Sequence, residues 1–261
     1  MDWHFPPQIV PATAEYALSV IVDQHRQQCQ FDPEVDPGAV LTFDTTVAQW
    51  RKACDLVNWS ALGRALNDGW AIHCTDQQWE SVLKPPRQRK LRDVCNLIAA
   101  HANREAIRPI TLFGKPCVTA GAFLTVRRLL RDVGAEVSDI APSTPLAPFL
   151  RRYVEVFLGP ISRLAPGALP PVKIHAPLYH AAVLGFFVSW LILLVGGLLS
   201  SRFPQAALLG VLAAGIFYAL IWIAAKSRPP SVEFGNLMTF RDLASLLARG
   251  EAPVATFNRS I

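Results

Sequence analysis

The sequence lacks the short motifs that mark the commonest catalytic and nucleotide-binding sites. It contains no GxGxxG, no Walker-type lysine loop, no HExxH and no GxSxG. Nothing therefore indicates dinucleotide binding, phosphate-loop chemistry, zinc proteolysis or serine hydrolysis, which depend on those motifs. Cys117 and His101 can be written as a nucleophile pair, but a chain with five cysteines and six histidines supplies such pairs by accident. We predict no catalytic residue, no cofactor and no enzymatic activity.

Cysteine is also scarce. The five cysteines are odd in number, and no two of them form a CxxC pair. Cys95 and His101 would give a zinc ion two ligands, whereas a structural zinc site needs four. The sequence therefore predicts no metal site and no disulfide framework. We expect the cysteines to be small buried apolar side chains in a reducing compartment.

Two long stretches lack Asp, Glu, Lys, Arg and His altogether, namely residues 181–199 and 206–225. At 1.5 Å per helical residue, each is about long enough to cross a hydrocarbon core of ~30 Å. Only residues 200–205 separate them, which allows a tight reversal. Because backbone groups in lipid must be satisfied internally, this pattern predicts a transmembrane helical hairpin over residues 178–226. A buried helical hairpin in a core is the alternative.

The basic residues around these stretches predict an orientation. One Lys or Arg lies in the reversal, and five lie in the outer flanks, which places both termini in the cytoplasm. The opening residues have no basic and apolar signal-peptide pattern. The sequence thus predicts a multi-pass protein of the cell (cytoplasmic) membrane with the lipid bilayer as a partner. Because neither span carries a charge, we expect an anchor and not a transporter. The flanking cations are Arg202 in the reversal, and Arg163, Lys173, Lys226, Arg228 and Arg241 outside it.

Charge is distributed unevenly along the chain. Residues 1–83 contain four Lys or Arg and eleven Asp or Glu, whereas residues 84–177 contain fifteen and six. Basic amphipathic helices are predicted at 119–133 and from 143 onward, and they suit either a lipid surface or packing on the preceding domain. Nucleic acid is the rival partner for basic runs, and we expect none.

Apolar periodicity predicts several helices before residue 103. Thr13 can cap a helix over 12–28, and apolar residues at steps of three and four indicate a core-facing helix over 56–70. Thr75 with Gln78 reads as a capping box at the start of a short helix. Further helices are expected at 45–52, 91–102 and 239–249, with a turn or loop at 84–90. No internal repeat long enough to define a solenoid is evident.

Residues 54–82 resemble the central part of acyl carrier proteins. Asp55-Leu56-Val57 stands where the family has Asp-Ser-Leu, and 66–72 and 75–78 resemble the following acidic–aromatic stretch and short helix. Residues 90–98 are similar to the last family helix, so the resemblance covers roughly residues 12–102. It implies a four-helix carrier-like bundle; a coincidental bundle is the alternative. Leu56 has no hydroxyl for phosphopantetheine, so the resemblance implies the fold without the carrier's cofactor.

These observations together predict an all-α protein with a cytosolic four-helix acyl-carrier-like bundle and a transmembrane hairpin. The predicted divisions are a carrier-like domain at 1–108, a basic Pro-rich region at 109–177, the hairpin at 178–226 and a cytoplasmic tail at 227–261. The predicted function is a non-enzymatic integral membrane protein whose helical domain binds a protein partner. The alternative is an accessory protein or enzyme of membrane lipid or acyl metabolism. The candidate interaction surface comprises Asp55, Asn58, Arg64 and Asp68.

Overall fold

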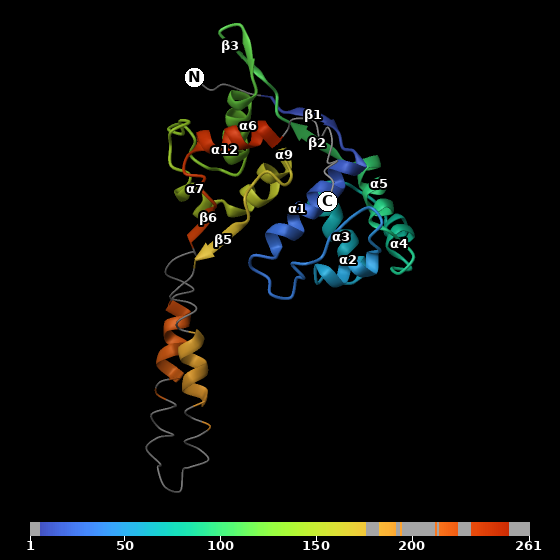
Figure 1. The fold of residues 1–261 in the computed structure, drawn as a ribbon, viewed down its shortest axis with the longest axis vertical. Helices are drawn as coiled ribbons and strands as arrows, with labels where there is room; N and C mark the ends of the chain where they lie inside the picture. Colours follow the sequence, from blue (N-terminus) through green and yellow to red (C-terminus); the bar gives the residue numbers. More distant parts are fainter. Residues whose placement is uncertain are drawn as a thin grey trace, which may run out of the picture. The chain divides into compact units, whose positions relative to one another are not determined.

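The computed structural model describes residues 6–175, 183–191, 194, 212, 214–223 and 231–250. The chain divides into two compact units (Figure 1). Unit 1 comprises Met1–Lys173 and Glu233–Ile261, and unit 2 comprises Ile174–Val232. Unit 2 thus interrupts the chain of unit 1. The four divisions predicted from the sequence stay a prediction.

Local signals start most of the helices in the first half of unit 1. Thr13 accepts a hydrogen bond from the Tyr16 N–H (3.2 Å) at the start of the first helix, as predicted. The capping box of Thr75 and Gln78 is also confirmed, since each side chain bonds the other residue's N–H. Side-chain caps satisfy N–H groups that have no partner within a helix. The helices are α1 (Ala14–Gln28), α2 (Val47–Ala53), α3 (Trp59–Trp70), α4 (Asp76–Leu83) and α5 (Leu91–His101).

The second half of unit 1 is built around one long helix and a helix from the end of the described chain. α6 (Val118–Asp132) packs against α12 (Phe240–Gly250). Gly134 follows α6 with φ +80°, the left-handed conformation in which glycine commonly ends a helix. Along the chain, α6 is followed by four short helices before unit 2 begins. They are α7 (Ala147–Arg152), α8 (Val154–Val156), the π-helix η1 (Phe157–Ile161) and α9 (Ser162–Leu164). The helix predicted from residue 143 is therefore broken into short pieces.

Strands contradict the all-α fold class. The described residues contain three two-stranded antiparallel sheets alongside the helices. Each pairs segments that are short and only partly apolar, so period-two alternation could not identify them. The pairs are β1 (Gln8–Pro11) with β2 (Asn103–Ala106), β3 (Ile110–Leu112) with β4 (Lys115–Cys117), and β5 (Val172–His175) with β6 (Ser231–Phe234).

The described part of unit 1 contains one backbone arrangement twice. In each copy a long helix is followed by a short helix and, later, by a returning helix of 11 residues. The first residue of the returning helix donates its N–H to a residue just before the short helix, and an N–H at the start of the short helix donates back. These bonds are Leu91 to Thr45 (2.9 Å) and Val47 to Arg89 (2.8 Å) in one copy, and Phe240 to Thr144 (3.2 Å) and Leu146 to Met238 (2.9 Å) in the other.

The two copies also bury equivalent side chains. In both returning helices the buried positions are the first, fourth, fifth and eighth residues, which form one helical face. Both returning helices also carry an aspartate at the third position, whose carboxylate accepts from the N–H of the residue preceding the helix. The equivalent buried residues are Leu91, Val94, Cys95 and Ile98 in α5, and Phe240, Leu243, Ala244 and Leu247 in α12.

The two copies differ in what connects the short helix to the returning helix. In the first copy this connection contains α3 and α4. In the second it contains α8, η1 and α9, and then residues 174–232, which are unit 2. Because β5 pairs with β6, the chain leaves and re-enters unit 1 through neighbouring strands. Unit 2 therefore has the connectivity of an insertion in the second copy.

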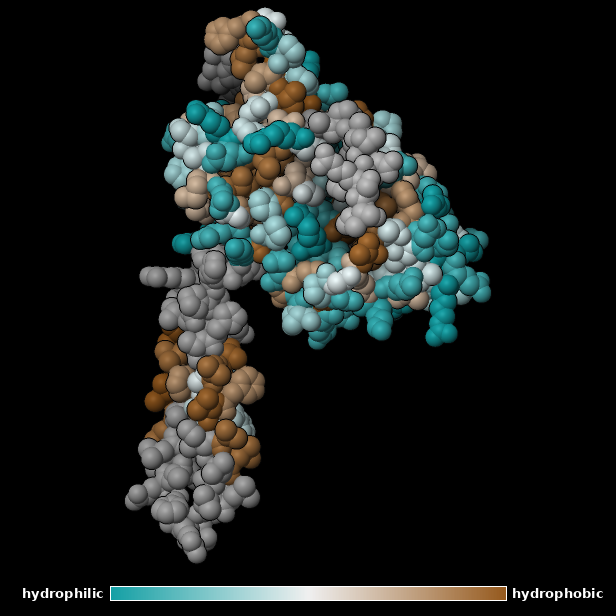
Figure 2. All heavy atoms as spheres, viewed as in Figure 1, coloured by the Kyte–Doolittle hydropathy of each residue, from teal (hydrophilic) through white to brown (hydrophobic). Residues whose placement is uncertain are grey.

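Unit 2 does not show the predicted transmembrane hairpin. Residues 183–191 and 214–223 are helical, and Figure 2 colours many of their described residues as hydrophobic. Among the residues that the structure describes, however, no helix combines the length and apolar character needed to cross a membrane. A spanning helix requires roughly 20 such residues. The predicted hairpin and the predicted multi-pass location in the cytoplasmic membrane are thus contradicted. The remaining parts of the predicted spans, and the predicted reversal with Arg202, lie outside the described residues.

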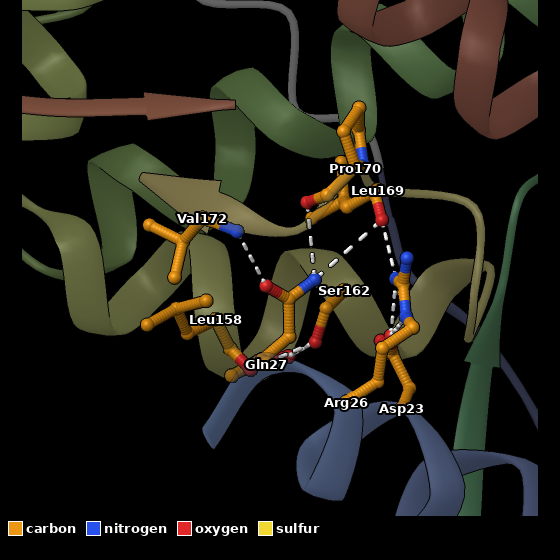
Figure 3. Close-up of polar contacts among 9 residues, drawn as sticks. Asp23, Arg26, Gln27, Leu158, Ser162, Leu169, Pro170 and Val172 are labelled. Atoms are coloured by element: carbon orange, nitrogen blue, oxygen red, sulfur yellow. Dashed lines mark hydrogen bonds and ion pairs between the residues drawn. The ribbon is translucent and has the colours of Figure 1, made fainter. Parts of the chain in front are cut away.

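Polar contacts join α1 to the segment that precedes β5 (Figure 3). Gln27 is buried, with its side-chain oxygen accepting from the Val172 N–H (2.9 Å) and its amide nitrogen donating to the Pro170 carbonyl (3.2 Å). One turn earlier, Asp23 is buried and forms an ion pair with Arg26 (2.6 Å), which also donates to the Leu169 carbonyl. These contacts satisfy carbonyl groups of Leu169 and Pro170, which precede β5, and the N–H of Val172, the first residue of β5.

Candidate interaction site

A hollow of about 640 Å³ lies among α2, α3 and α4. We call it the α2–α4 hollow. Its apolar walls come from the Trp59 ring, Leu83 and two consecutive prolines, and its polar groups come from one carboxylate, one hydroxyl and two cations. Recognition pockets combine apolar walls with a few placed polar groups in this way. The lining residues are Arg51, Trp59, Glu80, Ser81, Leu83, Lys84, Pro85 and Pro86.

The link between α2 and α3 positions the Trp59 ring. The Leu56 N–H donates to the Arg51 carbonyl (2.9 Å) after Asp55 turns the chain at φ +44°. Asn58 then caps α3 by accepting from the Ala61 N–H (3.0 Å). Helix α3 therefore begins at Trp59. The apolar periodicity had predicted a start at Leu56, so this part of the prediction is wrong. The reason is that the turn and the cap compete with helical geometry over residues 55–58.

Hydrogen bonds hold the opposite wall of the hollow. The Arg89 side chain donates to the Lys84 carbonyl (3.1 Å), and the Ala48 N–H donates to the Pro86 carbonyl (2.9 Å). The predicted loop at 84–90 is therefore fixed against α2. A wall whose backbone is held in this way loses little conformational freedom when it binds.

Two cations with different surroundings line the hollow. The Lys84 ammonium lies 4.1 Å from the Trp59 ring centroid and 3.0 Å from a Glu80 carboxylate oxygen, so its charge is partly compensated. Arg51 donates through Nε to the Val57 carbonyl (3.1 Å). No ion pair joins Arg51 to a carboxylate among the described residues. Arg51 is therefore the cation available to a carboxylate brought by a ligand.

The structure brings together only part of the predicted interaction surface. Asp55 and Asn58 are exposed in the link that leads to Trp59. Arg64 and Asp68 are also exposed. Arg64 follows Trp59 by five residues and Asp68 by nine, which at about 100° per residue places them about 140° and about 180° around the helix from Trp59. Both therefore lie on another face of α3. Leu56 is partly buried against the core, and it offers no hydroxyl. Nothing yet tests the role of these residues.

Four of the five thiols have a raised pKa. Burial raises the pKa of Cys54 to about 11 and that of Cys95 to about 12. Burial also raises the pKa of Cys29 and Cys74. A nucleophilic cysteine needs a lowered pKa, because the thiolate is the reactive form. In the described ranges, no group of three or more His, Cys, Asp or Glu side chains is placed to hold a metal ion.

Sequence reasoning missed the residues that form the hollow. Trp59 was assigned only to the core-facing stripe of its helix, and Lys84 to an exposed loop. Two signals pointed to them: an aromatic residue next to a helix cap, and two prolines between basic residues. No protein-family model, no curated protein and no solved structure that we compared matches this chain.

Proposed function

We propose that this protein is a non-enzymatic interaction protein whose α2–α4 hollow binds a peptide segment of a partner. The observation that carries the proposal is that an apolar wall around Trp59 lies beside Arg51, which forms no ion pair among the described residues. Tryptophan and arginine are the residue types most enriched among energetically dominant interface residues. The partner segment would place an apolar side chain against Trp59 and a carboxylate beside Arg51.

The carrier-like spacing of residues 12–102 remains part of this proposal. In carrier proteins the region at the start of the second helix contacts partners, and here the equivalent region leads into the hollow. Leu56 stands at the cofactor position, so the proposed interaction requires no covalent group. Asp55 and Asn58 would flank the bound segment, whereas Arg64 and Asp68 would contact only a larger partner.

Binding of defined peptides tests the proposal. An array of short peptides would pair one aromatic or aliphatic residue with Glu, Gln or Lys, and affinities for the full chain would be measured by fluorescence anisotropy. We expect Glu peptides to bind at least about tenfold more tightly than their Lys counterparts, because Arg51 attracts a carboxylate and repels an ammonium. A tenfold difference in affinity corresponds to about 1.4 kcal/mol. Trp59→Ala should remove binding of all of them, and Arg51→Glu should remove the preference for Glu.

Arg64→Glu is the matched control, since it makes the same charge change on another face of α3. It should leave the affinities unchanged. Equal binding of Glu and Lys peptides, or a loss with Arg64→Glu as large as with Arg51→Glu, would contradict the proposed site.

A second measurement addresses carrier chemistry directly. The full chain would be incubated with a phosphopantetheinyl transferase and coenzyme A, and its intact mass recorded. We expect no mass gain because Leu56 has no nucleophilic atom. A covalent adduct on any residue would instead favour an accessory role in acyl metabolism.

A further inference from the structure

The tip of the β3–β4 hairpin exposes an aromatic side chain in an unfavourable backbone conformation. Leu112 pairs with Lys115, so Phe113 and Gly114 form a two-residue turn, with φ +50° and +78°. Such turns favour Asn-Gly, because a bulky residue rarely adopts positive φ. Phe113 is nevertheless fully exposed, and Leu112 is 42% exposed. The fold therefore gains no burial from Phe113, which suggests a role in binding.

The surroundings of the tip are positively charged. Arg108 and Lys115 are exposed, and the sequence has no Asp or Glu from residue 106 to residue 131. The nearest acidic side chains, Glu105 and Asp132, form ion pairs with Arg128. Among the residues that the structure describes, no ion pair joins Arg108 or Lys115 to a carboxylate, so the hairpin presents an apolar tip with two unpaired cations.

A hollow of the opposite character lies elsewhere in unit 1. It has a volume of about 450 Å³ and lies between residues 34–41 and α2, and two carboxylates and one ammonium line it. The lining residues are Glu34, Asp36, Ala39, Val40, Leu41, Thr45, Gln49, Lys52 and Ala53. We call it the acidic hollow. A hydrogen bond that protonated Glu34 donates to the Asp55 carboxylate, together with the charges of Asp55 and Asp32, raises the pKa of Glu34. Val40 is 81% exposed at this site.

We infer that the hairpin tip of one copy of this chain inserts Phe113 into the acidic hollow of a second copy. The aromatic ring would contact the apolar surface of the hollow, while Lys115 and Arg108 would approach Glu34 and Asp36. Figure 1 shows the β3–β4 hairpin and α2 at opposite ends of unit 1, so one copy does not fill its own hollow. Because the two surfaces differ, the contact is head to tail and produces rings or open chains.

Sedimentation velocity of the purified full chain tests this association. We expect assembly that grows with protein concentration and weakens as salt screens the charges. Phe113→Asp removes the tip but leaves the hollow, and Glu34→Arg changes the hollow but leaves the tip. Each variant alone should self-associate at least about tenfold more weakly than the wild type, a difference of about 1.4 kcal/mol, and should be monomeric at concentrations where the wild type assembles. Circular dichroism would establish that both variants remain folded.

A mixture of the two variants gives the decisive result. It contains one functional tip and one functional hollow, so it should form heterodimers and nothing larger. The control Val133→Asp introduces the same charge at a half-exposed residue outside the hairpin and should assemble like the wild type. A monomeric wild type, assembly that survives Phe113→Asp, or a mixture without heterodimers would overturn the proposal. Binding of anionic vesicles that depends on Phe113, without self-association, would identify a different occupant and overturn it as well.

Discussion

The side-chain oxygen of Gln27 accepts a hydrogen bond from the backbone N–H of Val172, 145 residues later in the chain. The same amide donates to the carbonyl of Pro170, so one buried side chain satisfies two backbone groups next to β5. The contact fixes the segment through which the chain leaves unit 1.

Replacing Gln27 with leucine should destabilise unit 1. The substitution keeps the side chain's approximate size but leaves the Val172 N–H without its partner, and an unsatisfied buried group costs about 1–3 kcal/mol. Urea unfolding of the full chain followed by circular dichroism would measure the loss. Gln24→Leu is the matched control, since Gln24 is exposed on the same helix, and it should change stability by less than about 0.5 kcal/mol. Equal effects would contradict a specific role for Gln27.

Removal of unit 2 should leave unit 1 folded. Residues 176–230 would be replaced by a short Gly/Ser linker, which can join β5 to β6 because the two strands pair. Helix content per residue of unit 1 and cooperative thermal unfolding should persist. Truncation after His175, which also removes α12, should cause loss of cooperative unfolding, because α6 loses the helix that packs against it. A linker variant as unstable as the truncation would show that unit 2 is required for the fold.

Gly121→Ala should destabilise the protein far more than Gly159→Ala. A Cβ atom at Gly121 would lie 2.0 Å from the Arg108 carbonyl oxygen, and this backbone atom cannot move aside without shifting the chain before β3. Overpacking of this kind costs about 1–3 kcal/mol or more. At Gly159 a Cβ would meet nothing within 4 Å. Thermal unfolding of both variants would compare them, and similar melting temperatures would show that α6 and residue 108 are not in close contact.

The aspartate of the second returning helix should make stability depend on pH. Asp242 accepts hydrogen bonds from the Thr239 hydroxyl and N–H and the Met238 N–H, which lowers its pKa below the ordinary 3.8. A lowered pKa means that the unfolded state binds the proton more readily than the folded state does. The ionised Asp242 carboxylate therefore stabilises the folded state at pH values above its ordinary pKa. This stabilisation is lost as the pH falls through the folded-state pKa.

Asp242→Asn should therefore lower the melting temperature at pH 7, and the difference from the wild type should shrink as the pH is lowered below about 5. Asp68→Asn changes an exposed aspartate whose side chain makes no hydrogen bond or ion pair among the described contacts, and it serves as the control. A difference between Asp242→Asn and wild type that stays constant from pH 7 to pH 3 would contradict the role of the ionised carboxylate.

Helix starts in the first half could be predicted because their signals are local. Thr13 and Thr75 each act within a few residues of their own position. The start of α3 was misplaced because apolar spacing continues through residues 56–58, where the Asp55 turn and the Asn58 cap prevent a helix. The buried face of α3 could be predicted from the apolar spacing, whereas the residue at which the helix begins could not.

The pairing of distant segments could not be predicted from local pattern. β1 and β2 are short and half exposed, and only their antiparallel pairing makes them strands. The partner of α6 was also missed, since α12 was predicted as part of a tail. One signal was available: Arg-Asp recurs at the second and third positions of both α5 and α12. The predicted transmembrane hairpin failed because uninterrupted apolar composition was taken as evidence for two long helices.

The position of α12 has a consequence for synthesis of the chain. α6 is complete at Asp132, but its packing partner does not begin until Phe240. At ~5–20 residues per second, a ribosome adds the intervening segment in roughly 5–20 s. During that interval α6 has no α12 to pack against, and the apolar stretches between 181 and 225 emerge as well. The nascent chain is thus the form most exposed to aggregation and to chaperones, and the second copy closes only after α12 has been made.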